Sequence, residues 1–120
     1  MRYALLIAHL LLPAVAVAGP AEVPPEVLAR QTCQEHVVEP AKATPADFPK
    51  VSGEYNAYVI IDYRLDGSGN AVDPRVVEAR PRRGFDDYAL RMLERTRFAP
   101  GVQAQCTDVR TISKLRRSGR

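Results

Sequence analysis

The sequence predicts an α+β fold in which one helix packs on a small three-stranded antiparallel sheet, preceded by a short N-terminal arm. Three observations predict it. Residues 54–65 alternate side chains between two faces, and a glycine-containing turn leads from them to a second strand-like stretch. Residues 87–96 carry apolar side chains at helical spacing. Residues 19–47 contain prolines at a density that excludes a long helix or a central strand, which leaves an arm.

The first eighteen residues have the pattern of a secretory signal peptide. Arg2 supplies a positive charge, residues 3–18 are almost wholly apolar, and positions 16–18 form a small-x-small cleavage signal before Gly19. The alternative is an uncleaved inner-membrane anchor. A bilayer span takes about 20 apolar residues, and this run is shorter and contains Pro13. We therefore expect a cleaved leader over 1–18, export of the chain, and no membrane association of the exported chain.

Charge and composition exclude some partners. The formal net charge is +3, and removal of Arg2 with the leader leaves +2, from 16 basic and 14 acidic residues. This balance is too small to indicate a nucleic-acid partner. Composition leaves the oligomeric state open. Positive charge gathers near the C-terminus, where residues 116–120 form a basic tail that is either simply solvated or in contact with an anionic envelope surface. The basic residues of the last eleven positions, 110–120, are Arg110, Lys114, Arg116, Arg117 and Arg120.

The two cysteines, Cys33 and Cys106, permit one intramolecular disulfide, and export would place them in an oxidising compartment. Such a bridge closes a loop of about 74 residues and stabilises the fold by roughly 4 kcal/mol in the chain-entropy model. A redox-active pair is not expected, because the sequence has no Cys-x-x-Cys spacing. We predict a structural disulfide that ties down the arm.

The arm, residues 19–47, is expected to be extended apart from one short helix. Pro25 suits the first position of a helix, and the residues from there to Gln34 permit helical conformation, which would place Cys33 near the helix end.

The first predicted strand covers residues 54–65, and its turn covers residues 66–70, where two glycines supply positive φ angles. The second strand covers residues 71–78. Pro74 cannot donate a ladder hydrogen bond, so this strand is expected at an edge or with a bulge. One face of the first strand is expected to be buried, and it consists of Tyr55, Ala57, Val59, Ile61, Tyr63 and Leu65.

A helix is predicted over residues 87–96. Asp86 is expected as its N-cap, and Phe85 is expected to staple against Leu90. Pro100 and the glycine after it exclude a continuation of the helix. Residues 106–115 then form the third strand, although their apolar spacing is imperfect.

The order strand, glycine turn, strand, helix, strand resembles the C-terminal domain of TonB-type energy transducers. The resemblance covers about residues 48–115, and it implies a β-β-α-β fold, a non-enzymatic role and a protein partner in the cell envelope. The residues that match the family pattern are Val59, Ile61, Tyr63 and Leu65 in the first strand, Asp66 and Gly69 in the turn, Val76 in the second strand, and Phe85, Asp86, Ala89, Leu93, Phe98 and Pro100 around the helix.

The chain departs from that family at its N-terminus. The leader is short and looks cleaved, and residues 19–47 would reach only about 90 Å as polyproline. His9 resembles the membrane histidine of such anchors, but Leu5 stands where a serine is expected. The sequence therefore favours a periplasmic interaction module. One alternative is a short, membrane-anchored transducer for transport through outer-membrane receptors; another is a cationic protein that binds the cell envelope.

The resemblance implies that the last strand receives an extended segment of a partner, such as a segment of an outer-membrane receptor, by strand addition. Positive charge along this strand would favour an acidic partner. The alternative is an edge merely blunted by its charges against aggregation. The expected edge consists of Val109, Arg110, Thr111, Ile112, Ser113, Lys114 and Leu115.

No catalytic residue, cofactor site or metal site is predicted. His36 lies near Cys33, but two ligands do not make a zinc site. Asp86 and Asp87 are adjacent on the helix and diverge, so they do not form a catalytic pair. The loop after the second strand offers either an anionic contact or a solvated basic surface, through Arg80, Arg82 and Arg83.

Overall fold

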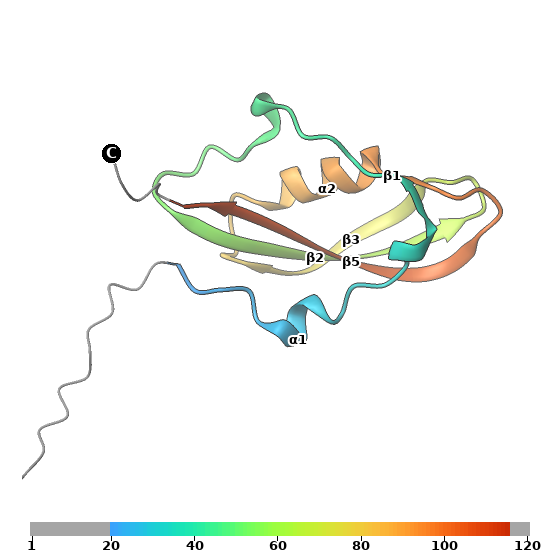
Figure 1. Cartoon of the computed structure of the whole chain (residues 1–120), viewed down its shortest axis with the longest axis horizontal. Helices are drawn as coiled ribbons and strands as arrows, with labels where there is room; N and C mark the ends of the chain where they lie inside the picture. Colours follow the sequence, from blue (N-terminus) through green and yellow to red (C-terminus); the bar gives the residue numbers. More distant parts are fainter. Residues whose placement is uncertain (1–19, 116–120) are drawn as a thin grey trace, which may run out of the picture.

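A computed structural model describes residues 20–115 (Figure 1). The leader predicted over 1–18, with its His9, and the basic tail 116–120 lie outside the described residues. Within residues 20–115, no helix has the length and apolar character that a membrane crossing requires. The elements follow in the order α1 (Pro25–Leu28), η1 (Gln34–His36), β1 (Val37–Glu39), η2 (Pro45–Asp47), β2 (Tyr55–Asp66), β3 (Ala71–Arg80), α2 (Asp86–Arg95), β4 (Arg97–Phe98) and β5 (Gln103–Lys114).

The predicted α+β fold is confirmed. Strands β3, β2 and β5 form an antiparallel sheet in that order, with β2 in the centre. Strand β5 begins at Gln103, three residues before the expected start, because it pairs with β2 along the full length from Tyr55 to Asp66. A further two-stranded sheet joins β1 to β4 and was not expected. Helix α2 covers one face of the main sheet (Figure 1).

The main core lies between α2 and the face of β2 that the alternation predicts. Phe85, Ala89 and Leu93 supply its helical side, and all three are fully or almost fully buried. The six alternating residues of β2 from Tyr55 to Leu65 are also buried there. This burial is what makes a β-branched, period-two sequence adopt a strand against an amphipathic helix.

The opposite face of β2 is also covered, which the alternating sequence pattern does not predict. Tyr58 and Ile60 are buried on that side against Val27 of α1, and Val109 packs at the margin of this second cluster. Figure 1 shows α1 on one side of the sheet and α2 on the other. The arm therefore completes a third layer, so β2 is not the half-buried strand that its sequence pattern suggests.

The α1 helix is much shorter than predicted. It ends at Leu28 instead of continuing to Gln34, and Cys33 adopts a left-handed conformation with φ of 66°. A helix through Gln34 would keep the arm on one face of the sheet. The chain instead turns around the edge of β5, and this turn requires irregular backbone.

Strand β3 is an edge strand with a bulge beside Pro74, as predicted, and it has a second bulge near Val77 that was not predicted. The register shifts once opposite Ile60–Ile61 and once opposite Asp62–Arg64, and Asp73 next to Pro74 has φ of 52°. The strand continues to Arg80, two residues beyond the expected end.

Gly69 in the β2–β3 turn is required by a close backbone approach. Its φ is 84°, and a Cβ atom there would lie 2.8 Å from the carbonyl oxygen of Phe98. The amide of Phe98 donates to the carbonyl of Gly69 at 2.8 Å. The turn thus holds the segment that leaves α2, and a side chain at this position would separate the two.

Helix α2 begins one residue earlier than predicted, and the predicted N-cap is wrong. Phe85 is the N-cap, no side chain caps the helix, and Asp86 is the first helical residue. The side chain of Phe85 is fully buried in the core, so the helix starts directly after this residue. Asp86 and Asp87 still place negative charge at the helix N-terminus, where the macrodipole favours it.

Candidate functional site

The edge predicted to bind a partner is the outer side of β5. In an antiparallel strand, successive residues direct their backbone N–H and C=O groups to opposite edges. Thr107 and Val109 bond to groups outside β2, so the odd-numbered residues of β5 face outward. The even-numbered residues face β2. Of the seven predicted edge residues, Val109, Thr111 and Ser113 present outward backbone groups within the strand, whereas Ile112 points its side chain into the core and is 4% exposed.

The other edge of the sheet is less suited to strand addition. Strand β3 carries two bulges, and Pro74 lacks an N–H group. A partner strand needs a regular row of donors and acceptors, which β5 offers and β3 does not.

The arm already occupies the middle of the β5 edge. The amide of Thr32 donates to the carbonyl of Thr107 at 2.9 Å, and the Thr107 amide donates to Oγ1 of Thr32 at 2.8 Å. The amide of Val109 donates to Oε1 of Gln31 at 2.6 Å. We name residues 31–33 the arm crossing. Because it bonds to both backbone groups of Thr107 and to the amide of Val109, a partner strand cannot use these groups while the crossing stays in place.

The predicted disulfide is confirmed and lies at the arm crossing. Cys33 and Cys106 are joined, with their Cα atoms 5.9 Å apart, and both are buried. The number of cysteines predicted this bond, but nothing in the sequence predicted the contacts of Gln31 and Thr32. The bond itself was the available signal, since residues next to Cys33 must lie near the neighbours of Cys106.

The outer edge beyond Val109 is open. Within residues 20–115, no group bonds to the backbone N–H or C=O groups of Thr111 and Ser113 that face outward. Both residues are exposed. The open edge, Thr111–Lys114, is therefore the part of the predicted site that is accessible in this structure.

Positive charge at this edge is partly compensated. Nε of Arg110 lies 3.1 Å from Oδ2 of Asp108, whose carboxylate is buried and also accepts a hydrogen bond from Gln31. Nζ of Lys114 lies 3.5 Å from the carbonyl of Val51. The expected preference for an acidic partner strand therefore depends mainly on Lys114 within the described residues.

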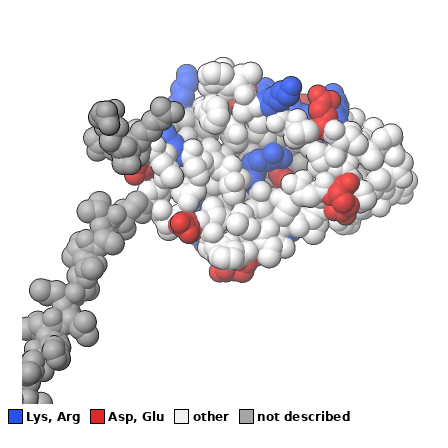
Figure 2. Space-filling view, viewed as in Figure 1, with Lys and Arg blue, Asp and Glu red and all other residues white. Residues whose placement is uncertain are grey.

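The basic loop lies at the opposite edge of the sheet. Arg80 pairs with Tyr58 of the central strand, and Tyr58 pairs with Thr111 on its other side. Arg80, Arg82 and Arg83 are exposed, but two strand spacings, about 10 Å, separate this row from β5. On the face drawn in Figure 2, basic and acidic side chains are interspersed among uncharged ones. The structure does not bring the loop and the β5 edge together.

Among residues 20–115, no group of three or more His, Cys, Asp and Glu side chains is placed to hold a metal ion. His36 instead lies 3.3 Å from the carboxylate of Glu35.

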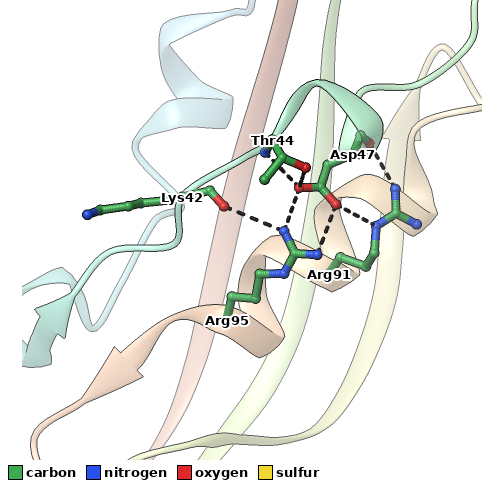
Figure 3. Close-up of polar contacts among 5 residues, drawn as sticks. All are labelled: Lys42, Thr44, Asp47, Arg91 and Arg95. Atoms are coloured by element: carbon green, nitrogen blue, oxygen red, sulfur yellow. Dashed lines mark hydrogen bonds and ion pairs between the residues drawn. The ribbon is translucent and has the colours of Figure 1, made fainter.

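An ion pair between the buried carboxylate of Asp47 and the partly exposed side chain of Arg95 anchors the continuation of the arm over α2 (Figure 3). Arg95 donates to both carboxylate oxygens of Asp47, at 2.5 and 2.9 Å. The amide and hydroxyl of Thr44 donate to the same carboxylate in a capping box, and Arg91 donates to the Asp47 carbonyl at 2.8 Å. The hydrogen bonds from Arg95, followed by that from the Thr44 amide, hold the pKa of Asp47 well below its usual range.

We expect this carboxylate to make stability fall in acid. The unfolded chain protonates Asp47 near pH 4, at its ordinary pKa, while the folded chain keeps it ionised. The unfolded state thus binds more protons below about pH 4, and folding stability decreases as the pH falls towards the lower folded pKa. Asp47→Asn should be less stable than wild type at pH 7 and should depend less on pH below 4. Thermal unfolding across pH 2–7 measures both effects.

Asp73→Asn is the matched control. Asp73 pairs with Arg64 at 2.6 Å, but both side chains are largely exposed, and such pairs contribute little. A pH profile of Asp47→Asn that coincides with those of wild type and Asp73→Asn would contradict the anchoring role of Asp47.

Comparison with known proteins gives one match. The family model described as Gram-negative bacterial TonB protein C-terminal matches residues 50–116. No curated protein matches the chain, and no solved structure matches it. The matched residues contain β2, β3, α2 and β5, whereas the arm crossing lies outside them.

Proposed function

The chain belongs to the family of Gram-negative bacterial TonB protein C-terminal domains, and from this membership we propose that it binds a protein partner in the periplasm by strand addition to β5. Domains of this family are transport-associated protein-interaction modules and not enzymes. The proposal adds the binding mode and the location. The partner is an extended segment of a cell-envelope protein, such as an outer-membrane receptor.

The open edge of β5 is the observation that carries the proposal. Thr111 and Ser113 each offer one donor and one acceptor that no described residue uses. Strand addition takes its affinity from such main-chain hydrogen bonds. The regular pairing of β5 with β2 along twelve residues keeps these groups in line for an incoming strand.

Two observations support a periplasmic location. Domains of this family are periplasmic in general. The disulfide between Cys33 and Cys106 is of the kind that persists in oxidising compartments. The signal-peptide pattern of residues 1–18 agrees with both and supplies a route of export.

Replacing Ser113 with proline should weaken capture of the partner roughly tenfold, because it removes one outward N–H donor and places a ring at the edge. The Ser113 amide makes no bond to β2, so the fold should tolerate the change better than a proline at buried Ile112. The measurement is quantitative capture of envelope proteins from a Gram-negative extract by the immobilised full chain, with each captured protein identified by mass spectrometry.

Ser113→Ala is the matched control. It also loses the hydrogen bond from the Ser113 hydroxyl to Asn56, at 2.6 Å, but it keeps the backbone donor. A protein captured equally by both variants does not bind by strand addition here. High salt provides a second control, because screening weakens a cationic envelope contact sharply and main-chain hydrogen bonds much less. Capture that is abolished by salt and unaffected by Ser113→Pro would favour the cationic alternative.

A further inference from the structure

The N-terminal arm wraps around the outer edge of β5 from one face of the sheet to the other. Before the arm crossing, Val27 packs beneath the sheet against Ile60. After it, β1 pairs with β4 on the side of α2, and η2 lies over α2 itself (Figure 1). The arm crossing is the point where the chain passes the edge.

The arm crossing imitates a partner strand over two residues. Thr32 takes both the donor and the acceptor of Thr107, and Gln31 takes the donor of Val109. The same Gln31 side chain donates to the buried carboxylate of Asp108 at 3.2 Å. A partner segment that extended from Ser113 to Thr107 would have to displace these contacts.

The disulfide holds the arm crossing at this place. Cys33 follows Thr32 directly, and Cys106 precedes Thr107, so the bond lies beside the two residues that exchange hydrogen bonds. Without the bond, the crossing would depend on a few hydrogen bonds to exposed or half-buried groups and on the small contact of Val27 beneath the sheet.

We propose that the Cys33–Cys106 disulfide is a latch that closes the middle of the β5 edge and confines strand addition to Thr111–Lys114. The inference rests on the proposed function, since it concerns regulation of the same site. A dithiol reductant would open the latch by thiol–disulfide exchange. Its first thiolate attacks one sulfur to give a mixed disulfide, its second thiol displaces that sulfur, and Cys33 and Cys106 leave as two thiols while the reductant becomes a disulfide.

The latch sets the length of partner segment that the domain accepts. With the latch closed, the open edge offers the outward groups of Thr111 and Ser113 alone, so a short extended segment that turns away before Val109 fits. With the latch open, Val109 and Thr107 extend the row of donors and acceptors towards the start of β5. The reduced domain therefore accepts a longer segment and binds it more tightly.

Amide hydrogen exchange of the full chain tests the latch without any partner. Reduction with dithiothreitol, or the Cys33→Ala/Cys106→Ala double variant, should speed exchange at Thr107 and Val109 on the order of a hundredfold. Arg110 and Ile112 face β2, so in the reduced chain they should stay better protected than Thr107 and Val109, and their loss should not exceed the global loss of stability. Unchanged exchange at Thr107 and Val109 would overturn the proposal. Equal protection of all four amides in the reduced chain would also overturn it, since the bond would then stabilise the whole fold and not the edge in particular.

A synthetic probe tests the consequence for binding. The probe is an eight-residue peptide that alternates valine with threonine or glutamate, added to the isotope-labelled full chain. Amide shifts should change at Thr111 and Ser113 in the oxidised protein and extend to Val109 and Thr107 after reduction. Shifts that reach Thr107 in the oxidised protein would overturn the latch while strand addition holds. Faster exchange at Thr107 after reduction, without peptide binding in either state, would support the latch and count against strand addition.

A disulfide-retaining variant separates the bond from its neighbours. Gln31→Ala/Thr32→Ala removes the side-chain hydrogen bonds to Val109 and Thr107 but leaves the covalent link. The latch predicts that the peptide shifts still end at Thr111 in this variant. Shifts that extend to Thr107 with the disulfide intact would assign the closure to the two side chains and overturn the role of the bond.

Discussion

Replacing Cys33 and Cys106 with alanine should lower the free energy of unfolding by about 4 kcal/mol, because the bond closes a loop with a sequence separation of 73 residues. In the unfolded chain, the bond removes the conformations in which these residues are far apart. Small domains are stable by roughly 5–15 kcal/mol in total, so this is a large share. Urea denaturation of the oxidised wild type and the double variant, at one pH, measures the difference.

The reduced wild type is the control for the two alanine side chains. It lacks the same cross-link but keeps the cysteine side chains. It should therefore lose nearly the same stability as the double variant. A loss below about 1 kcal/mol in both would contradict the loop-closure argument and would indicate that the unfolded chain already holds the arm near β5.

Phe85→Ala should cost about 3–5 kcal/mol, the range for truncating a buried phenylalanine. Phe85 is fully buried beneath the start of α2, and its ring meets that of Tyr55 edge to face at 4.8 Å. Truncation leaves a cavity between β2 and the first turn of the helix and removes this ring contact. Chemical denaturation measures the loss, and one-dimensional NMR establishes whether the variant keeps a folded state.

Phe48→Ala is the matched control for removing a phenyl ring. Phe48 stacks on Tyr88 with ring centroids 5.6 Å apart, but its side chain is 46% exposed. Its truncation should cost about 1 kcal/mol. Equal losses for the two variants would contradict the assignment of Phe85 to the centre of the core.

The regular elements of this protein follow from local patterns. The alternation between Tyr55 and Leu65 predicted the buried face of β2, and Pro74 predicted an edge strand with a bulge. The helix was predicted within one residue at each end. These predictions succeed because burial on one side imposes a period of two on a strand and of 3.6 on a helix.

The N-cap shows where a local rule gives way to packing. Asp86 has the side chain that caps favour, but Phe85 holds the cap position because the core takes its ring. Burial of a whole phenyl ring is worth more than one capping hydrogen bond. A single sequence does not reveal which of two competing local preferences the core will override.

Only part of the candidate site could be predicted from the sequence. The position of β5 as an accepting strand was predicted from the family pattern, and the disulfide from the number of cysteines. The direction of each backbone group along β5, and the occupation of Thr107 and Val109 by the arm, were not. The direction of the backbone groups depends on whether the odd- or the even-numbered residues of β5 face β2. The occupation by the arm depends on contacts between residues that lie 75–78 positions apart in the sequence.

By itself, the sequence determined the three strands of the main sheet, helix α2 and the only cysteine pairing, because each depends on residue types a few positions apart or on a count. The tertiary structure alone decided that the arm covers both Ile60 and the middle of the β5 edge. An irregular, proline-rich segment has no periodic pattern from which its path could be predicted. Its path is set by the long-range contacts that satisfy its backbone groups and bury its few apolar side chains, and these exist only once the domain has folded.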